Sequence, residues 1–366
     1  MLHSSVAPYL LWAKTREAAS IDLAGSNLVH CSLDDLHGAR DAVDITARND
    51  NGYLPLVEAI ANHYDVPADR VVSASGCSGA HFLAIAATVG AGDHVLVERP
   101  GYDPLLGACL LMGANVERFD RTFASRFAID VDALADRMTS RTRLIVVSAP
   151  HNPSGVSLDA TTLSELGRMA AHAGAHVLVD EVYLDAASLV RGDPPTARSA
   201  ARLGGPFIVT NSLTKSYGLA GLRSGWAIAP APTAERMRRT RDVVDNAGNA
   251  PADRLAALAF SQLPRLGDRA RRLLKSNLEL ARTFVARHQE LELVEKPHAS
   301  VIFPRLAGVD DAEPFVARLL AEHGVAVAPG RFFDAPAHFR VSLAGQTSKL
   351  SEGLAALSRA LSTLNR

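Results

Sequence analysis

The chain has 366 residues, 48% of them hydrophobic, which is enough for more than one hydrophobic core. Its 38 Lys and Arg residues nearly balance its 39 Asp and Glu residues, so no overall positive charge attracts nucleic acid or an anionic membrane. The three cysteines, Cys31, Cys77 and Cys109, are too few and too scattered for a disulfide framework, which favours a reducing cytoplasm. The N-terminal segment is a poor signal peptide, and no apolar stretch is long enough to predict a membrane span.

From about residue 55 to residue 230, short apolar runs alternate with helical patterns. The patterns predict helices over 55–64, 78–90, 104–114 and 161–174, and strands over 70–74, 93–98, 143–150, 175–182 and 207–212. Apolar strands separated by helices indicate a mainly parallel sheet that is covered on both faces. In such α/β folds, ligands bind at the carboxyl ends of the strands.

The pattern changes after Pro251. A helix over 252–263 is interrupted by Pro264, and a charged helical stretch follows to about Glu290. The rest of the chain has apolar runs over 300–306, 325–329 and 339–343, a helix near 312–323 and a last helix from about Ser348. This mixture predicts a smaller α+β domain. We therefore expect a large domain over 41–270 and a small domain formed by 1–40 and 271–366.

Two of the predicted strands lead into turns that could bind polar groups. The first leads into Gly76, Cys77 and Ser78 at the start of a helix, where free backbone N–H groups and the helix dipole favour a phosphate. The second leads into Asn152, which Pro153 holds in an extended conformation. Each feature taken alone is equally explained by an ordinary turn.

Two further strands end at ionisable residues. Asp180 ends one of them, where its carboxylate could contact a cationic ligand atom, and Tyr183 follows three residues later. The other leads into Ser212 and Lys215, with Arg223 eight residues beyond the lysine. Hydroxyl groups and a guanidinium suit a phosphate dianion. A lysine that is partly removed from water can form a Schiff base with a carbonyl compound.

One ligand would satisfy all four sites if it carried a phosphate, a ring nitrogen, a polar ring substituent and an aldehyde. Pyridoxal 5'-phosphate carries all of these, and a Schiff-base lysine with an aspartate at the ring nitrogen is its usual signature. No metal site is predicted. His172 and His176 have the spacing of a helical ligand pair, but Gly174 interrupts the helix between them.

These motifs occur in the order typical of the class I/II aminotransferases, and the sequence resembles this family over nearly its whole length. The resemblance implies the aspartate-aminotransferase fold, fold type I of the pyridoxal-phosphate enzymes. That fold has a seven-stranded, mainly parallel sheet flanked by helices and a smaller α+β domain built from both termini. The resemblance also implies a homodimer.

The resemblance assigns roles to individual residues. Lys215 would form the Schiff base, Asp180 would hold the ring nitrogen, and Tyr102 of "RPGYDPL" would stack on the ring. The remaining cofactor contacts would come from Gly76, Cys77, Ser78, Asn152, Tyr183, Ser212 and Arg223. Substrate would be bound by Arg340 of "HFRVSLAG", which would clamp the α-carboxylate, by Asn152, and by Gly25 of "LAGSN", which would close over it.

The sequence departs from the family pattern at one position. Many members carry a tyrosine that reaches across the dimer to the phosphate, and Ala47 stands at that offset here. Either Asn49 or Asn51 replaces this contact, or the contact is missing. The amides of "AGSN" and "RNDNGY" are further candidates for substrate specificity, with loop capping as the alternative.

The resemblance implies an aminotransferase that moves an amino group from an amino acid to a 2-oxo acid. The same residues would also serve β-elimination, decarboxylation, racemisation or ring closure on a sulfonium amino acid, and the sequence does not separate these reactions. A third alternative is a non-catalytic ligand-sensing module, which normally has an attached DNA-binding domain; we expect no such domain here.

Overall fold

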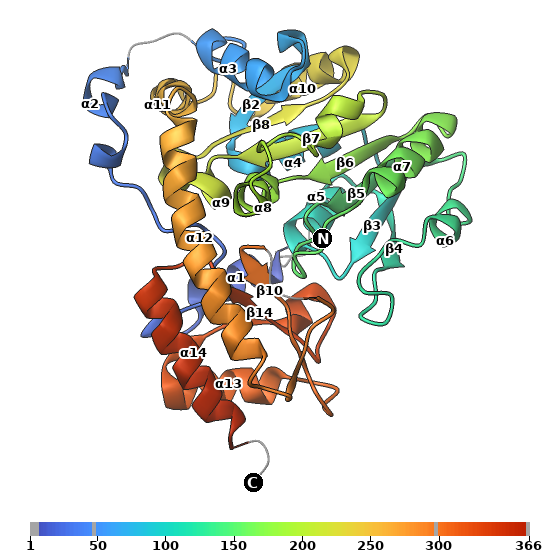
Figure 1. Cartoon of the computed structure of the whole chain (residues 1–366). Coiled ribbons are helices and arrows are strands. Elements are labelled where there is room, and N and C mark those ends of the chain that lie inside the picture. Colours follow the sequence, from blue (N-terminus) through green and yellow to red (C-terminus); the bar gives the residue numbers. More distant parts are fainter. Residues whose placement is uncertain (1–6, 46–48, 296–298, 364–366) are drawn as a thin grey trace.

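The computed structural model describes residues 7–45, 49–295 and 299–363. An upper part is built around one large sheet, and a lower part combines the N-terminal segment with the C-terminal third of the chain (Figure 1). The long helix α12 (Leu263–Val285) runs from one part to the other.

The large sheet has seven strands and a mainly parallel arrangement. Its spatial order is β2 (Val71–Ser75), β8 (Ser224–Ile228), β7 (Phe207–Ser212), β6 (His176–Asp180), β5 (Thr142–Ser148), β3 (His94–Arg99) and β4 (Asn115–Asp120). Only β8 is antiparallel to its neighbours, β2 and β7. The predicted sheet is therefore confirmed. The sequence patterns missed β4, a half-exposed strand with charged residues, and β8, a short strand that contains a glycine.

Helices cover both faces of this sheet. One face packs against α4 (Gly76–Ala86), α5 (Asp103–Leu111) and α10 (Ala231–Val244). The other packs against α3 (Leu54–Tyr64), α7 (Ala160–His172) and α11 (Ala250–Phe260), with α8 (Leu184–Arg191) and the short helices α2 (Ala39–Ala42), α6 (Val131–Ala135) and α9 (Thr214–Tyr217) nearby. Successive strand residues serve opposite faces: Ile145 packs into one core and Val146 into the other.

The lower part is an α+β unit. Its helices are α1 (Pro8–Thr15), α13 (Glu313–His323), α14 (Thr347–Leu361) and the C-terminal half of α12. Its strands form three small sheets: β1 (Ile21–Asp22) with β12 (Val325–Ala326), β10 (Val301–Ile302) with β14 (Phe339–Ser342) and β13 (Ala328–Pro329), and β9 (Leu291–Glu292) with β11 (Arg305–Leu306). Short 3-10 helices in the described parts of the whole chain lie at Leu33–Asp35, Ala68–Arg70, Ala200–Leu203, Ala220–Leu222 and Gly330–Phe333.

Helix α12 belongs to both cores. Leu266 packs into the core of the upper part, and Leu278 packs into the core of the lower part. In the lower part, Asn277 Nδ2 donates to the carbonyl oxygens of Leu343 (2.7 Å) and Gly345 (2.8 Å), which follow β14. The domain boundary expected at residues 270 and 271 falls inside this helix. We propose that the two parts of the chain meet at this boundary.

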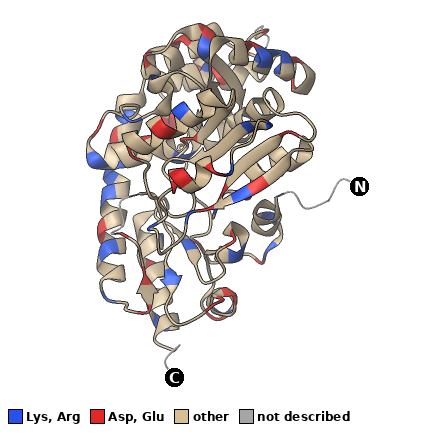
Figure 2. Cartoon of the chain, turned by 90° about the vertical axis from the view of Figure 1, so that its right-hand side faces the viewer, with Lys and Arg blue, Asp and Glu red and all other residues tan. Residues whose placement is uncertain are grey.

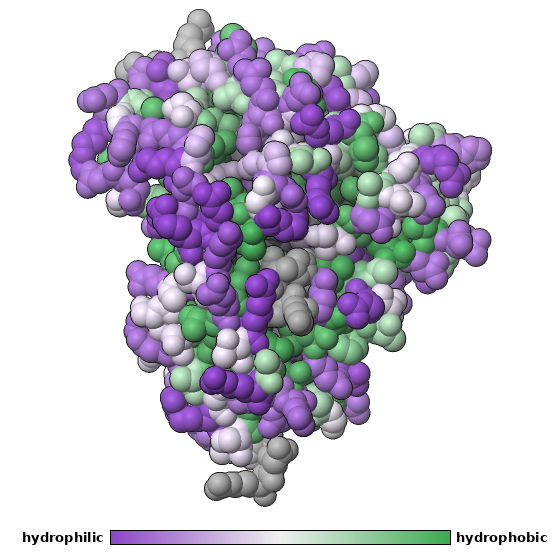
Figure 3. Space-filling view, viewed as in Figure 1, coloured by the Kyte–Doolittle hydropathy of each residue, from purple (hydrophilic) through white to green (hydrophobic). Residues whose placement is uncertain are grey.

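The surface is polar and mixed in charge. Lys and Arg residues are interspersed with Asp and Glu on the face in Figure 2. In Figure 3, polar side chains dominate, and apolar groups are most evident where the upper and lower parts meet and on the right flank. The arginines of α10 do not all belong to a solvated face: Arg241 is buried and donates to Ser73 Oγ (3.0 Å). Among the described helices, none is long and apolar enough to cross a membrane.

Candidate active site

Most of the predicted site residues line one cavity at the carboxyl ends of the central strands, whereas Gly76, Tyr183 and Arg340 are not part of its lining. This cavity has a volume of about 490 Å³. Its lining includes Gly25, Cys77, Ser78, Tyr102, Asn152, Asp180, Ser212, Lys215 and Arg223, all expected from the sequence. It also includes Ser26, Asn27 and His81. A larger surface hollow of about 820 Å³, lined by residues of α3, α8, α11 and α12, contains none of the predicted site residues.

The turn that opens α4 forms one wall of the cavity. Gly76 has a φ of +73°, and a Cβ at this position would meet the guanidinium of Arg223. The neighbouring strand β8 also approaches this turn closely, because a Cβ at Gly225 would meet the backbone of Gly76 and Cys77. No side chain caps the start of α4, so its first backbone N–H groups can bind an anion beside the Arg223 guanidinium.

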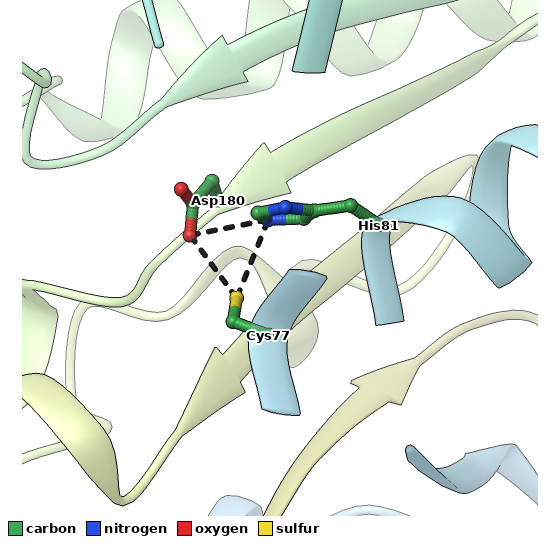
Figure 4. A group of neighbouring side chains, drawn as sticks. All are labelled: Cys77, His81 and Asp180. Carbon is green, nitrogen blue, oxygen red and sulfur yellow. Dashed lines mark hydrogen bonds and ion pairs between the residues drawn. The ribbon is translucent and has the colours of Figure 1, made fainter. Parts of the chain in front are cut away.

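Asp180 lies at the end of β6 with only 1% of its side chain exposed. Its Oδ1 atom accepts a hydrogen bond from the backbone N–H of Val182 (3.1 Å) and lies 3.5 Å from both Cys77 Sγ and His81 Nε2 (Figure 4). The next residue, Glu181, points away from the cavity and accepts hydrogen bonds from Ser199 Oγ (2.6 Å) and Ala200 N (2.7 Å). Successive side chains at the end of β6 point in opposite directions, so only the Asp180 carboxylate of this pair faces the cavity and can contact a ligand.

Arg340 of β14 is buried, with its guanidinium held by polar groups from two other segments. Nη1 donates to Asn152 Oδ1 (2.8 Å), and Nη2 donates to Tyr9 Oη (2.7 Å) and to the carbonyl oxygen of Ala24 (2.9 Å). These bonds orient the guanidinium beside Asn152, the other residue that the family resemblance assigns to substrate binding, and the carboxylate-binding role of Arg340 stays a prediction. Tyr9 was not predicted, because a single tyrosine in an N-terminal helix belongs to no motif.

Lys215 extends from α9 toward the loop that follows β1. Its Nζ atom donates to Ser26 Oγ (2.9 Å) and Asn27 Oδ1 (2.8 Å). Burial, and after it the positive charge of Arg340, lower the pKa of the Lys215 amine to about 8, while the negative charge of Asp180 opposes the shift. The amine is therefore much closer to neutrality at physiological pH than an ordinary lysine. Ser26 and Asn27 belong to the "AGSN" segment, and here they contact the lysine.

The positions proposed to replace the family tyrosine do not line this cavity. Ala47 lies outside the described residues. Asn49 Nδ2 donates to Asp253 Oδ2 (2.7 Å), and Asn51 Oδ1 accepts from Arg239 Nη2 (2.9 Å). Neither amide contacts the cavity of its own chain, so a role in binding phosphate would require a partner subunit.

The comparisons with known proteins agree with this geometry. Residues 42–357 match the model of the family "Aminotransferase class I and II". The chain is 34% identical to capreomycidine synthase of Streptomyces vinaceus over 302 residues, which cover 81% of this chain and 76% of that protein. The chain therefore belongs to the class I and II aminotransferase family, whose members depend on pyridoxal phosphate.

Solved structures support the same assignment. A pyridoxal-phosphate-dependent aminotransferase from Streptococcus suis 89-1591 superposes with a TM-score of 0.88 and 25% identity over 98% of each chain. The pyridoxal-phosphate-dependent cyclase OrfR superposes with a TM-score of 0.84 and 26% identity over 97% of this chain and 96% of that one. The predicted aspartate-aminotransferase fold is thereby confirmed.

The residues around the cavity fit this cofactor. The glycine at position 76 lets the Arg223 guanidinium lie directly against the turn, beside the free backbone N–H groups of α4, where a Cβ would collide with it. The hydroxyl of Tyr183 is buried without a hydrogen-bond partner among the described residues. It can therefore donate a hydrogen bond to an oxygen atom of a ligand. Together with Lys215 and Asp180, these groups supply partners for the phosphate, ring oxygen, aldehyde and ring nitrogen.

Proposed function

We propose that this protein is a pyridoxal-phosphate-dependent aminotransferase that moves an amino group from an amino acid to a 2-oxo acid. The observation that supports this most strongly is the convergence of Lys215, Asp180 and Arg340 on one region of the protein. The pKa of the Lys215 amine is lowered to about 8. Asp180 and Arg340 are buried and carry opposite charges, so they suit a cationic and an anionic group of the ligands, respectively. The proposal includes the cofactor and substrate contacts assigned above from the family resemblance.

In this proposal each residue has a defined task. Arg340, aligned by Tyr9 and Asn152, binds the substrate α-carboxylate through charge-assisted hydrogen bonds of its guanidinium. Asp180 keeps a proton on the ring nitrogen of the cofactor, which supplies an electron-accepting ring that stabilises negative charge at the substrate Cα. Lys215 covalently holds the cofactor and, once free and neutral, takes the proton from the substrate Cα at Nζ.

Ser26 and Asn27 support Lys215 in this role. Because both accept hydrogen bonds from Nζ, they provide a resting position for the amine when it is not bound to the cofactor. They come from the loop that also contains Gly25, so the segment that covers the cavity also orients the base. The sequence had suggested these polar residues only as candidates for specificity.

A second candidate function is ring closure of an amino acid. The specific observation that favours it is the similarity to capreomycidine synthase and to the cyclase OrfR. Removal of the Cα proton by Lys215 would also start this reaction if the substrate carried a leaving group at Cβ and a nucleophile further along its side chain. The leaving group would depart from Cβ, and the nucleophile would then bond to Cβ and close the ring. The nitrogen at Cα would then stay in the product.

The two functions are separated by following nitrogen with mass spectrometry. The purified protein with pyridoxal phosphate would be incubated with a panel of amino acids, including members with a β-hydroxyl and a side-chain nucleophile, with and without a 2-oxo acid. An aminotransferase converts the amino acid to its 2-oxo acid and aminates the acceptor in equal amounts. A cyclase gives a product that keeps its nitrogen, has lost water, and forms without an acceptor. No reaction in either case, with cofactor bound, would contradict both functions.

We also propose a homodimer in a reducing cytoplasm. Two apolar side chains near the loop before α3 and at the end of α10 are strongly exposed: Ile45 (83%) and Val243 (88%). A second subunit would cover such exposed apolar side chains, and their burial would stabilise the dimer. Cys31, Cys77 and Cys109 are all free thiols, which is typical of a reducing compartment.

A further inference from the structure

Three potential metal ligands meet at the floor of the cavity. Cys77 and His81 are four residues apart on α4, so they lie on the same face of the helix, and that face is turned toward Asp180 at the end of β6 (Figure 4). The family resemblance gives Asp180 a cofactor contact and Cys77 a backbone contact, and it gives no role to His81. His81 went unnoticed in the sequence because it sits in an otherwise apolar helix.

The spacing of the donor atoms matches a tetrahedral metal ion. Cys77 Sγ lies 3.3 Å from His81 Nε2, and Asp180 Oδ1 lies 3.5 Å from each of these atoms. A tetrahedral zinc ion with usual bond lengths to sulfur, nitrogen and oxygen keeps such donors about 3.3 to 3.6 Å apart. The distance between His81 and Asp180 is longer than the roughly 2.7 to 3.2 Å of a direct N–H···O hydrogen bond.

The charge and the location of the three residues also suit a divalent cation. A thiolate and a carboxylate together neutralise two positive charges, which a buried site requires. The side chains of His81 and Asp180 are only 4% and 1% exposed, yet all three residues line the 490 Å³ cavity. The cavity provides access to the ion and space for a fourth ligand such as water.

We propose that Cys77, His81 and Asp180 bind a thiophilic divalent cation of the zinc type when the cofactor is absent, and that this cation and pyridoxal phosphate exclude each other. A cysteine binds a metal ion as its thiolate, so Cys77 must give up its thiol proton. Metal binding exchanges this proton for the cation, and one proton is released to solvent. The exclusion, but not the metal site, rests on the proposed role of Asp180, because one carboxylate cannot serve the ring nitrogen and the ion together.

Cobalt(II) alone is a suitable probe, because a thiolate ligand gives it a near-ultraviolet charge-transfer band and tetrahedral coordination gives it strong visible bands. Protein freed of cofactor would be titrated with cobalt(II) in its wild-type form and as Cys77→Ser, His81→Leu and Cys31→Ser. We expect one cobalt ion per chain in the wild type and in the Cys31→Ser control. Cys77→Ser should lose the charge-transfer band, and His81→Leu should bind at least tenfold more weakly. A band that survives in Cys77→Ser would overturn the site.

The exclusion is tested separately. Saturating pyridoxal phosphate should displace cobalt from the wild-type protein, and zinc added to the cofactor-bound protein should lower the cofactor absorbance at equilibrium. His81→Leu should still bind pyridoxal phosphate, because the family resemblance gives His81 no cofactor contact, and zinc should lower its cofactor absorbance only at concentrations at least tenfold higher. Cobalt and cofactor bound together at full occupancy would contradict the exclusion. This result would not affect the proposed transamination, which is tested by the mass-spectrometry assay.

Discussion

The amine of Lys215 shows how burial prepares a single residue for chemistry. Desolvation and the charge of Arg340 both disfavour its protonated form, and they outweigh the attraction of Asp180. Two oxygen atoms, Ser26 Oγ and Asn27 Oδ1, then hold the amine at the cavity wall. A general base must be neutral and positioned, and this environment provides both conditions.

The reactivity of Lys215 should therefore titrate far below that of an ordinary lysine. The folded pKa is about 8, so the neutral fraction should rise with pH and reach half near pH 8. Acetylation of the cofactor-free protein, followed by peptide mass spectrometry across pH 6 to 11, measures this profile. In Arg340→Gln the inflection should move to higher pH, because a repelling charge is lost. An inflection of the wild-type lysine above about 10, the value for free lysine, would contradict the assignment.

Replacement of Arg340 by lysine should weaken substrate binding without disturbing the cofactor. Lysine keeps the charge but loses the planar pair of donors that Tyr9, Asn152 and Ala24 align. Loss of a charged hydrogen bond of about 1.5–3 kcal/mol raises KM roughly 10- to 100-fold. Steady-state kinetics would show this increase with a smaller change in kcat, while the absorbance of bound cofactor stays the same. An unchanged KM would remove Arg340 from the substrate site.

At the scale of elements, the site depends on the close approach of α4, β8 and Arg223. Gly76 and Gly225 allow this approach, because a side chain on either would meet the neighbouring segment. The start of α4 can then present its backbone N–H groups to an anion. The wall that we propose to bind phosphate is thus made by packing between two elements that are far apart in the sequence.

Gly225→Ala should separate these elements and weaken cofactor binding. The new methyl group would overlap the backbone of Gly76 and Cys77, which cannot move aside as a flexible side chain could. We expect at least a tenfold increase in the Kd for pyridoxal phosphate, measured by absorbance titration, and a lower Tm. The control is Gly221→Ala, at an exposed glycine whose Cβ would meet nothing within 4 Å. Equal Kd values for the two variants would refute this explanation.

The elements that carry motifs could be predicted from the sequence, and those that depend on packing could not. Apolar runs of strand length identified β5, β6 and β7, and the polar residues after them identified the site. His81 and Tyr9 carry no local signal, because their contacts with Asp180 and Arg340 arise only when distant segments pack together. The strand β4 was missed for a related reason: at the sheet edge its side chains are half-exposed, so they show no continuous apolar run.

At the scale of the whole molecule, the exposed apolar groups predict self-association. Val243→Asp would place a charge on a side chain that is 88% exposed and that a second subunit would bury. We expect the wild type to sediment as a dimer and the variant to shift toward monomer at micromolar concentration. The folded state of the variant can be checked by its circular dichroism. A wild-type monomer at all concentrations, or a variant that dimerises equally well, would contradict the proposed interface.

Helix α12 has a consequence for how the two halves of the site are spaced. Its 23 residues correspond to a rod of about 34 Å that is anchored in the core of each part. Asn277 ties this rod to the segment directly after β14, the strand that carries Arg340. In the proposed function, the distance between the carboxylate-binding Arg340 and the base Lys215 therefore depends on one stiff helix, which keeps the two groups at a fixed spacing.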